Sequence, residues 1–235
     1  MRYNRQIKLF GKSGQRKLRN SKIAIVGLGG LGCMVTTYLT AAGVGTLVLI
    51  DHDVVKLSDL NRQFLHWTTD IGKKKIVSAK RKLKLLNPEV EFVVYDEKIK
   101  NIETSEKIFE NVDGIVDCTD SFEVRYLLNK IALKLNIPLF HGACGRFEGR
   151  ATTIIPGKTA CLMCIYPRAK TLKRSSILGS VAGTIGTIQA TEVVKYITEK
   201  DDLLVNKLLI YDCKKMMFDV VKLKRNPTCE ECGKK

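Results

Sequence analysis

The sequence predicts an α/β fold with a doubly wound, mainly parallel sheet that is extended by antiparallel strands. Hydrophobic segments of strand length alternate with helical patterns between residues 23 and 141, which is typical of βαβ units and a parallel sheet. A glycine-rich turn joins the first strand to the first helix. After Gly149 the alternation ends, and the pattern indicates an added strand, one helix and a final antiparallel pair.

The parallel part follows a basic arm, residues 1–21, which precedes the first apolar strand. Residues 71–86 have apolar side chains near one side, which predicts a helix, and Asn87-Pro88 ends it. The expected strands of this part are 23–26, 47–50, 92–95, 114–117 and 139–141, and the expected helices are 30–42, 71–86 and 123–135.

The C-terminal part is expected to add an antiparallel extension to the sheet. Its predicted elements are a strand at 151–155, a helix at 182–198, and an antiparallel pair at 207–211 and 217–223. Residues 166–176 are polar and basic, and we interpret them as a mobile loop.

The charge of the chain favours an acidic partner. Forty Lys and Arg residues against 24 Asp and Glu give a formal net charge of +16, which suits a nucleotide, a nucleic acid or an acidic protein. The 28 uncharged residues between Lys22 and Asp51 contain six glycines, so their pattern fits strand, turn, helix and strand better than a membrane span. Residues 1–20 do not resemble a secretory signal, and we expect a cytoplasmic protein.

Residues 27–32 read GLGGLG and match the GxGxxG pattern of a Rossmann-like nucleotide site. Glycine lets the backbone turn sharply and approach phosphate, and the start of the next helix offers unpaired amides. Asp51 follows the last glycine by 19 residues and is placed to accept hydrogen bonds from ribose hydroxyls. The pattern predicts an adenine nucleotide and leaves both NAD and ATP open.

The segment after Asp51 favours ATP. Nucleotidyl transfer needs positive charge on a polyphosphate as it breaks, whereas hydride transfer needs few cations near the cofactor. Arg62 and Lys75 fit the first task, although a lysine in a run of three is often solvated. Asp120 follows an apolar strand at the edge where ligands of open sheets bind, so it is a candidate Mg²⁺ ligand or a cap for the helix near Glu123.

The chain has eight cysteines, and four of them form two CxxC pairs. Each pair can place two thiolates on one tetrahedral ion, and four thiolates favour structural zinc, with an iron–sulfur or redox role as the alternative. Isolated cysteines are more often small buried residues than nucleophiles. The paired residues are Cys161, Cys164, Cys229 and Cys232, and the isolated ones are Cys33, Cys118, Cys144 and Cys213.

In combination, these motifs resemble the HesA/MoeB/ThiF family, which is related to the ubiquitin-activating enzymes. The resemblance covers nearly the whole chain. It rests on Arg2-Tyr-Asn-Arg5-Gln6, the GLGGLG turn, Asp51 to Gln63, Lys75, Cys118-Thr-Asp120, Gly186-Thr-Ile-Gln189-Ala190, both CxxC pairs and Tyr211-Asp212.

The resemblance implies ATP-dependent adenylation of the C-terminal glycine of a small ubiquitin-like protein ending in Gly-Gly, by a Mg²⁺-dependent homodimer. It implies one adenylation domain over residues 1–235, with an arm (1–21), a nucleotide-binding half (22–148) and a half that binds the protein partner and zinc (149–235). The implied nucleotide-site residues are Gly27, Gly29, Gly30, Asp51, Asp53, Ser58, Asp59, Asn61, Arg62, Gln63, Lys75, Asp120 and Ser121. The implied catalytic residues are Arg5, Arg62, Lys75 and Asp120, with Arg5 as an arginine finger in the other subunit's site and Asp120 on Mg²⁺.

Two features depart from the family pattern. Asp59 stands where the family commonly has Asn, and an extra carboxylate repels a triphosphate unless it binds metal or orients Arg62. Many relatives have a cysteine in the loop after the first CxxC pair, but residues 165–187 contain none. We therefore expect the reaction to stop at the acyl-adenylate and sulfur to come from a separate persulfide donor, unless Cys118, Cys144 or Cys213 substitutes.

Two other functions remain as alternatives. The basic arm suits a tRNA-activating enzyme of the threonylcarbamoyl-adenosine dehydratase type, but the zinc pairs favour the protein-activating branch, so nucleic acid is not the expected partner. A non-enzymatic, zinc-stabilised binding module would make the nucleotide motif a coincidence. The lysines of residues 73–84 that phosphate does not use are interpreted as attraction for an acidic protein partner.

Overall fold

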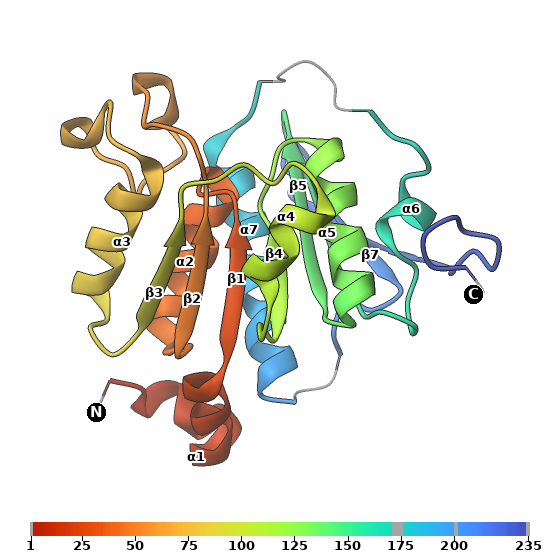
Figure 1. The fold of residues 1–235 in the computed structure, drawn as a ribbon, viewed down its shortest axis with the longest axis horizontal. Coiled ribbons are helices and arrows are strands. Elements are labelled where there is room, and N and C mark those ends of the chain that lie inside the picture. The colour runs from red at the N-terminus through yellow and green to blue at the C-terminus, as the bar shows by residue number, and fades with distance from the viewer. Residues whose placement is uncertain (1, 171–175, 200–201, 234–235) are drawn as a thin grey trace.

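The computed structural model describes residues 2–170, 176–199 and 202–233. Within them, an eight-stranded sheet has the order β3-β2-β1-β4-β5-β6-β7-β8 (Figure 1). Pairings from β3 to β5 are parallel and those from β5 to β8 are antiparallel, which confirms the expected fold class. The strands are β1 (Lys22–Val26), β2 (Thr46–Ile50), β3 (Glu91–Tyr95), β4 (Gly114–Asp117), β5 (Leu139–Gly145), β6 (Glu148–Ile154), β7 (Lys207–Asp212) and β8 (Met217–Lys222).

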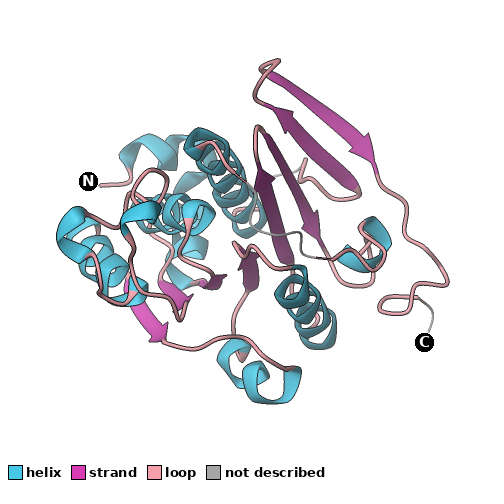
Figure 2. Ribbon diagram, turned by 90° about the horizontal axis from the view of Figure 1, so that it is seen from above, coloured by secondary structure: helices cyan, strands magenta, loops and turns pink. Residues whose placement is uncertain are grey.

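Helices cover both faces of the parallel strands (Figures 1 and 2). Helices α2, α3 and α7 lie on one face, and α4 and α5 lie on the other. None of the described helices is long and apolar enough to cross a bilayer. The helices are α1 (Asn4–Asn20), α2 (Gly30–Ala42), α3 (Lys75–Leu86), α4 (Ile102–Ser105), α5 (Phe122–Leu135), α6 (Leu162–Ile165) and α7 (Gly179–Ile197), with 3-10 turns η1 (Leu57–Asp59), η2 (Thr68–Asp70) and η3 (Glu106–Phe109).

Alternate side chains of β1 enter two separate cores. Ile23 and Ile25 pack with side chains of α2, α3 and α7, whereas Ala24 and Val26 pack with side chains of the other face. All four are buried. A strand with both faces covered has no reason to alternate with polar residues, which explains its continuous apolar sequence.

The basic arm is helical, which the sequence pattern did not predict. Helix α1 is broken at Gly11, whose φ of 75° is left-handed. Most of its residues are polar, so the few that pack against the rest of the protein form no recognisable apolar pattern. Leu18 is fully buried in the core, and Gln6 Nε2 donates to the Ala42 carbonyl at 2.7 Å. Tertiary contacts therefore stabilise α1, which lies beside the start of β1 (Figure 1).

Several boundaries differ from the expected ones. Helix α3 begins at Lys75 because Gly72 has a φ of 85° and the chain before it forms the turn η2. Helix α7 begins three residues earlier than expected, at Gly179. Strands β5 and β6 are longer and form a hairpin. The expected mobile loop at 166–176 includes residues 171–175, which lie outside the described residues.

Candidate functional site

The carboxyl ends of β1, β2 and β4 meet at one edge of the sheet. The glycine-rich turn follows β1, Asp51 follows β2, and Asp120 follows β4. Because β2 and β4 lie on opposite sides of β1, the chain leaves the sheet in two directions here. This switch point is where ligands of open α/β sheets bind.

Two positions in the glycine-rich turn admit no side chain. Gly27 has a φ of 93°, and a Cβ there would lie 2.7 Å from the Cys118 carbonyl oxygen. A Cβ on Gly32 would lie 1.9 Å from the Gly27 carbonyl oxygen. At Gly30 the nearest neighbour of such a Cβ is Ala182 on α7, at 2.9 Å, so close helix packing also requires this glycine.

Asp51 ties the turn to the end of β2. Its Oδ2 accepts a hydrogen bond from the Leu28 N–H at 2.7 Å, and its Oδ1 accepts one from the Asp53 N–H at 2.7 Å. A carboxylate oxygen can accept more than one hydrogen bond, so Asp51 retains capacity for ribose hydroxyls. The ribose role of Asp51 stays a prediction.

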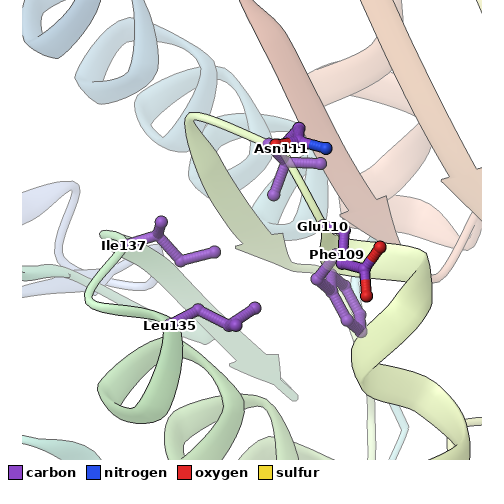
Figure 3. A pocket seen from close by; sticks show the side chains of 6 residues that line it. Phe109, Glu110, Asn111, Leu135 and Ile137 are labelled. Carbon is purple, nitrogen blue, oxygen red and sulfur yellow. The ribbon is translucent and has the colours of Figure 1, made fainter.

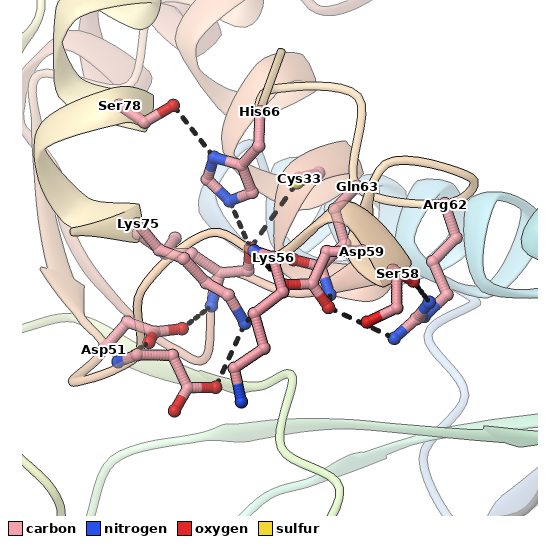
Figure 4. A network of polar contacts seen from close by, with 12 residues as sticks. Cys33, Asp51, Lys56, Ser58, Asp59, Arg62, Gln63, His66, Lys75 and Ser78 are labelled. Carbon is pink, nitrogen blue, oxygen red and sulfur yellow. Dashed lines mark hydrogen bonds and ion pairs between the residues drawn. The ribbon is translucent and has the colours of Figure 1, made fainter. Parts of the chain in front are cut away.

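Asp59 holds the η1 segment together (Figure 4). Its Oδ1 accepts from Gln63 Nε2 at 3.1 Å and lies 3.5 Å from Arg62 Nη2, and its Oδ2 accepts from the Lys56 N–H at 3.0 Å. Arg62 Nη1 also donates to the Ser58 carbonyl at 2.8 Å and the Asn61 side chain at 2.9 Å. Of the two roles left open for Asp59, metal binding and orientation of Arg62, the second has its contact in the structure.

Lys75 is buried, so the solvated-face interpretation is wrong. Its Nζ lies 3.0 Å from Asp53 Oδ2 and 3.9 Å from Asp59 Oδ2. Burial alone would raise the pKa of Asp53, but the Lys75 hydrogen bond and charge lower that pKa below its ordinary value. Arg62 and Lys75 thus already have carboxylate partners, which nucleotide phosphates would have to displace or outcompete.

Three further predicted site residues, Asp120, Gly29 and Arg5, lie in different surroundings. Asp120 is exposed, and its interpretation as a helix cap is wrong because Ser121 caps α5 by accepting from the Val124 N–H at 3.3 Å. Gly29 lies close to Gln63, since a Cβ built on it would be 3.8 Å from Gln63 Nε2. Arg5 is exposed on α1, and this helix lies at the opposite edge of the sheet from the glycine-rich turn (Figure 1).

Most lysines of residues 73–84 are paired within the chain. Lys74 lies 3.1 Å from Asp96, and Lys84 donates to the Pro88 carbonyl at 2.7 Å. Lys82 is buried and paired with Asp70, which Arg81 also contacts at 3.0 Å. These contacts reduce the charge that the α3 surface offers to an acidic partner.

Sequence reasoning missed a buried polar network beside the turn. His66, Asp70, Ser78 and Lys82 are all buried and contact one another through hydrogen bonds, with His66 reaching the Leu28 carbonyl. No sequence motif identifies this network, because neither a single histidine nor one lysine within a basic helix has a characteristic spacing to its partners. The Asp117 carboxylate similarly accepts from His141 Nδ1 at 2.7 Å, between neighbouring parallel strands.

The two CxxC pairs meet, as predicted. The Sγ atoms of Cys161 and Cys164 are 3.9 Å apart, those of Cys161 and Cys229 are 3.7 Å apart, and those of Cys164 and Cys232 are 3.5 Å apart. Four sulfurs at about 2.3 Å from a tetrahedral zinc would be about 3.8 Å apart. A disulfide would need about 2.05 Å, and the four thiols are free. The donor set and its spacing fit zinc.

Two of the isolated cysteines are poor nucleophiles in this structure. Burial raises the pKa of Cys144 to about 11, and burial with the Asp117 charge raises the pKa of Cys118 well above its ordinary value. Because the thiolate is the reactive form, neither residue is activated at neutral pH.

A pocket of about 430 Å³ lies away from this site (Figure 3). Its lining comes from the segments before β4 and β5, at the opposite edge of the sheet from the glycine-rich turn. The lining residues are Phe109, Glu110, Asn111, Val112, Leu135 and Ile137. The pocket contains none of the predicted site residues.

Comparison with known proteins agrees with this geometry. The family model described as the ThiF family matches residues 3–231. This chain belongs to the ThiF family. Over 99% of its length, it is 39% identical to the SAMP-activating enzyme E1 of Haloferax volcanii and 38% identical to the molybdopterin-synthase adenylyltransferase of Escherichia coli, covering 88% and 96% of those proteins.

The chain is also similar to part of a longer relative and to a solved structure. The chain is 39% identical over 99% of its length to the adenylyltransferase and sulfurtransferase MOCS3 of Drosophila virilis, but it spans only 53% of that protein. The crystal structure of E. coli MccB with ATP superposes with a TM-score of 0.88 at 26% identity, over 99% of this chain and 74% of MccB. The relatives are named as adenylyltransferases or activating enzymes, and this chain is an adenylyltransferase of their type.

Proposed function

We propose that this chain adenylates the C-terminal glycine of a small ubiquitin-like sulfur-carrier or modifier protein. The observation that carries the proposal is the meeting of the glycine-rich turn, Asp51, Arg62 and Lys75 at one edge of the sheet, in a chain with adenylyltransferase relatives. The name of the Haloferax relative refers to activation of SAMP, and that of the E. coli relative to molybdopterin synthase.

The reaction requires two negatively charged groups to approach each other. An oxygen of the glycine carboxylate attacks the α-phosphorus of ATP, the bond from that phosphorus to the bridging oxygen breaks, and pyrophosphate leaves with the bonding electrons. Arg62 and Lys75 supply positive charge to the phosphates, Asp51 holds the ribose, and Asp120 binds the Mg²⁺ that accompanies ATP. Because Arg62 and Lys75 are already held by Asp59 and Asp53, both cations are oriented before ATP arrives.

A homodimer explains the position of Arg5. This residue lies on α1, at the opposite edge of the sheet from its own glycine-rich turn, so it is remote from its own nucleotide site. We propose that Arg5 of one subunit completes the site of the other as an arginine finger.

The reaction ends at the acyl-adenylate. Residues 165–187 contain no cysteine, and the high pKa values of Cys118 and Cys144 make them poor candidates for a covalent intermediate. The terminal sulfur of a separate persulfide donor would then attack the acyl carbon and displace AMP, which gives an acyl disulfide. A second thiol would reduce that disulfide, which releases the thiocarboxylate and leaves the two thiols joined as a disulfide.

The division of labour within the chain follows from these assignments. Residues 22–148 bind the nucleotide, and residues 149–235 bind the protein partner and zinc. The Cys161, Cys164, Cys229 and Cys232 thiolates hold one structural zinc, which ties the C-terminal segment to α6.

The decisive experiment is ATP–pyrophosphate exchange with purified full-length chain. Exchange should require a ubiquitin-like protein ending in Gly-Gly and should disappear when the final glycine of that protein is deleted. A tRNA preparation is the matched control for the dehydratase alternative. Exchange that responds to tRNA and ignores every Gly-Gly protein would overturn the proposal, and no ATP binding at all would favour a non-enzymatic module.

A further inference from the structure

The Leu28–Gly29 peptide of the glycine-rich turn is held from inside the protein. The Leu28 carbonyl lies 3.0 Å from Nε2 of His66, which is 2% exposed (Figure 4). A trans peptide points its C=O and N–H in opposite directions, and the described residues contain no cis peptide. With its carbonyl turned toward the buried histidine, this peptide directs the Gly29 N–H away from the histidine, and Gly29 itself is half-buried.

Chemistry fixes which histidine nitrogen carries the proton. A backbone carbonyl can only accept, so His66 Nε2 must be the donor. Burial lowers the pKa of His66, and the nearby charges of Lys75 and Lys82 lower it further, so the imidazole is neutral at neutral pH. A neutral imidazole that donates from Nε2 must accept at Nδ1, where the Ser78 hydroxyl lies 3.0 Å away.

Lys82 sets the direction of the Ser78 hydroxyl. An ammonium only donates, and Lys82 Nζ donates to Ser78 Oγ at 2.8 Å. The hydroxyl proton must therefore go to another acceptor, and three lie within reach: Asp70 Oδ2 at 2.9 Å, His66 Nδ1 at 3.0 Å and the Leu65 carbonyl at 3.3 Å. Asp70 already accepts from Lys82, Arg81 and the Trp67 N–H, and the Leu65 carbonyl already accepts from Lys82. Among the described residues, Ser78 is the one donor that contacts His66 Nδ1, so the proton goes to His66.

We infer that His66 is a positioning residue for phosphate binding: the chain Lys82 to Ser78 to His66 to Leu28 sets the turn so that the Gly29 N–H faces a nucleotide phosphate. Asp51 Oδ2 accepts from the N–H of Leu28 at 2.7 Å, so both peptides that flank Leu28 are fixed before nucleotide arrives. The inference rests on the proposed function only in requiring a phosphate-bearing ligand at this turn.

The test compares the full-length wild type with three variants of His66. His66→Phe removes the donor and keeps a ring, whereas the side chains of His66→Asn and His66→Gln differ by one methylene. His66→Gln places its amide nitrogen near the original Nε2 and can reach Leu28, while His66→Asn can reach only Ser78. Equilibrium binding is measured by calorimetry with ATP and with adenosine, and Thr36→Val, which removes a buried hydroxyl within α2, is the control.

A lost phosphate contact should change ATP binding alone. We expect His66→Asn and His66→Phe to weaken ATP about tenfold, since a hydrogen bond to a charged group is lost, and to leave adenosine within about twofold. His66→Gln should recover ATP binding to within about threefold, and Thr36→Val should match wild type. Equal losses for ATP and adenosine, or binding by His66→Gln as weak as by His66→Asn, would overturn the inference.

The proposed function can fail separately. If ATP binding follows the expected order but no Gly-Gly protein supports pyrophosphate exchange, the role of His66 stands and the proposed reaction is wrong. If wild type binds adenosine and ATP with equal affinity, the turn holds no phosphate and the inference is wrong.

Discussion

The proposed nucleotide site and the four-cysteine cluster were both predicted from short motifs, yet their side chains are arranged in different ways. At the nucleotide site, the charged groups have partners within the chain: Lys75 with Asp53, and Arg62 with Asp59. At the four-cysteine cluster, the thiols face one another at 3.5 to 3.9 Å along three pairs, a spacing suited to an ion. The first site is self-supporting without its ligand, and we expect the second to depend on one for stability.

The largest effect should follow from removing the metal. We expect Cys229→Ser to reduce the zinc content below the expected one ion per chain. It should also lower the free energy of unfolding by about 4 kcal/mol, which is the contribution of an ion present at about a thousand times its dissociation constant. Plasma emission spectroscopy and denaturant unfolding would measure the two quantities. Cys213→Ser, at a half-buried cysteine outside the cluster, is the control. Full stability of Cys229→Ser without zinc would show that the C-terminal segment does not need an ion.

A loss of activity with little loss of stability should follow from Lys75→Ala. We expect turnover to fall by about 10² to 10³, the range seen when a group that stabilises developing charge is removed. Lys74→Ala is the matched control, because Lys74 is adjacent and half exposed and pairs with Asp96 instead. Steady-state kinetics and thermal unfolding of both variants would separate the effects. Equal turnover in the two variants would remove Lys75 from the catalytic groups.

Acid should lower the stability of the buried network of His66, Asp70, Ser78 and Lys82, because the Asp70 carboxylate becomes protonated. Burial alone would raise the pKa of this carboxyl, but the hydrogen bonds from Lys82 and the Trp67 N–H hold it well below its ordinary value. A depressed pKa contributes stability above the unfolded value near 4, and that contribution is lost as the pH falls toward the folded value.

Asp70→Asn should therefore cost about 3 kcal/mol at pH 7, because it leaves the buried Lys82 ammonium without its counter-charge. Urea unfolding between pH 7 and pH 3 should show a steeper decline for wild type than for the variant. Parallel curves would mean that Asp70 does not titrate with unfolding. Asp96→Asn, which removes an exposed carboxylate, provides the baseline.

What the sequence could predict was set by distance along the chain. The glycine-rich turn, Asp51 and the CxxC pairs are local patterns whose geometry follows from a strand, a turn or a knuckle, and the structure confirms their expected positions. The pairing of Lys75 with Asp53 and the contacts among His66, Asp70 and Ser78 arise only when the loop before α3 packs against that helix. Helix α1 was missed for the same reason, because docking of Leu18 and Gln6 stabilises it and its own pattern does not.

Substitution of Asp59 should give the smallest effect, and it tests directly whether a carboxylate of the chain itself orients the cations of the site. Its carboxylate orients Arg62 and Gln63, but it also places a negative charge where a triphosphate would bind. Asp59→Asn keeps the shape and one acceptor while it removes the charge. Two like charges about 6 Å apart repel by roughly 1 kcal/mol where water screens them, so the KM for ATP should fall about fivefold, with unfolding free energy reduced by less than about 1 kcal/mol.

Asp96→Asn is again the matched control, since it makes the same substitution at an exposed ion pair and should leave the KM unchanged. Measuring the KM for ATP at several Mg²⁺ concentrations would distinguish repulsion from metal binding. If the carboxylate only repels phosphate, the variant binds ATP more tightly at every Mg²⁺ concentration. If the variant instead has a higher KM for ATP that excess Mg²⁺ restores, Asp59 is a metal ligand. The orientation of Arg62 and Lys75 would then depend on that ion as well as on the carboxylates of the chain.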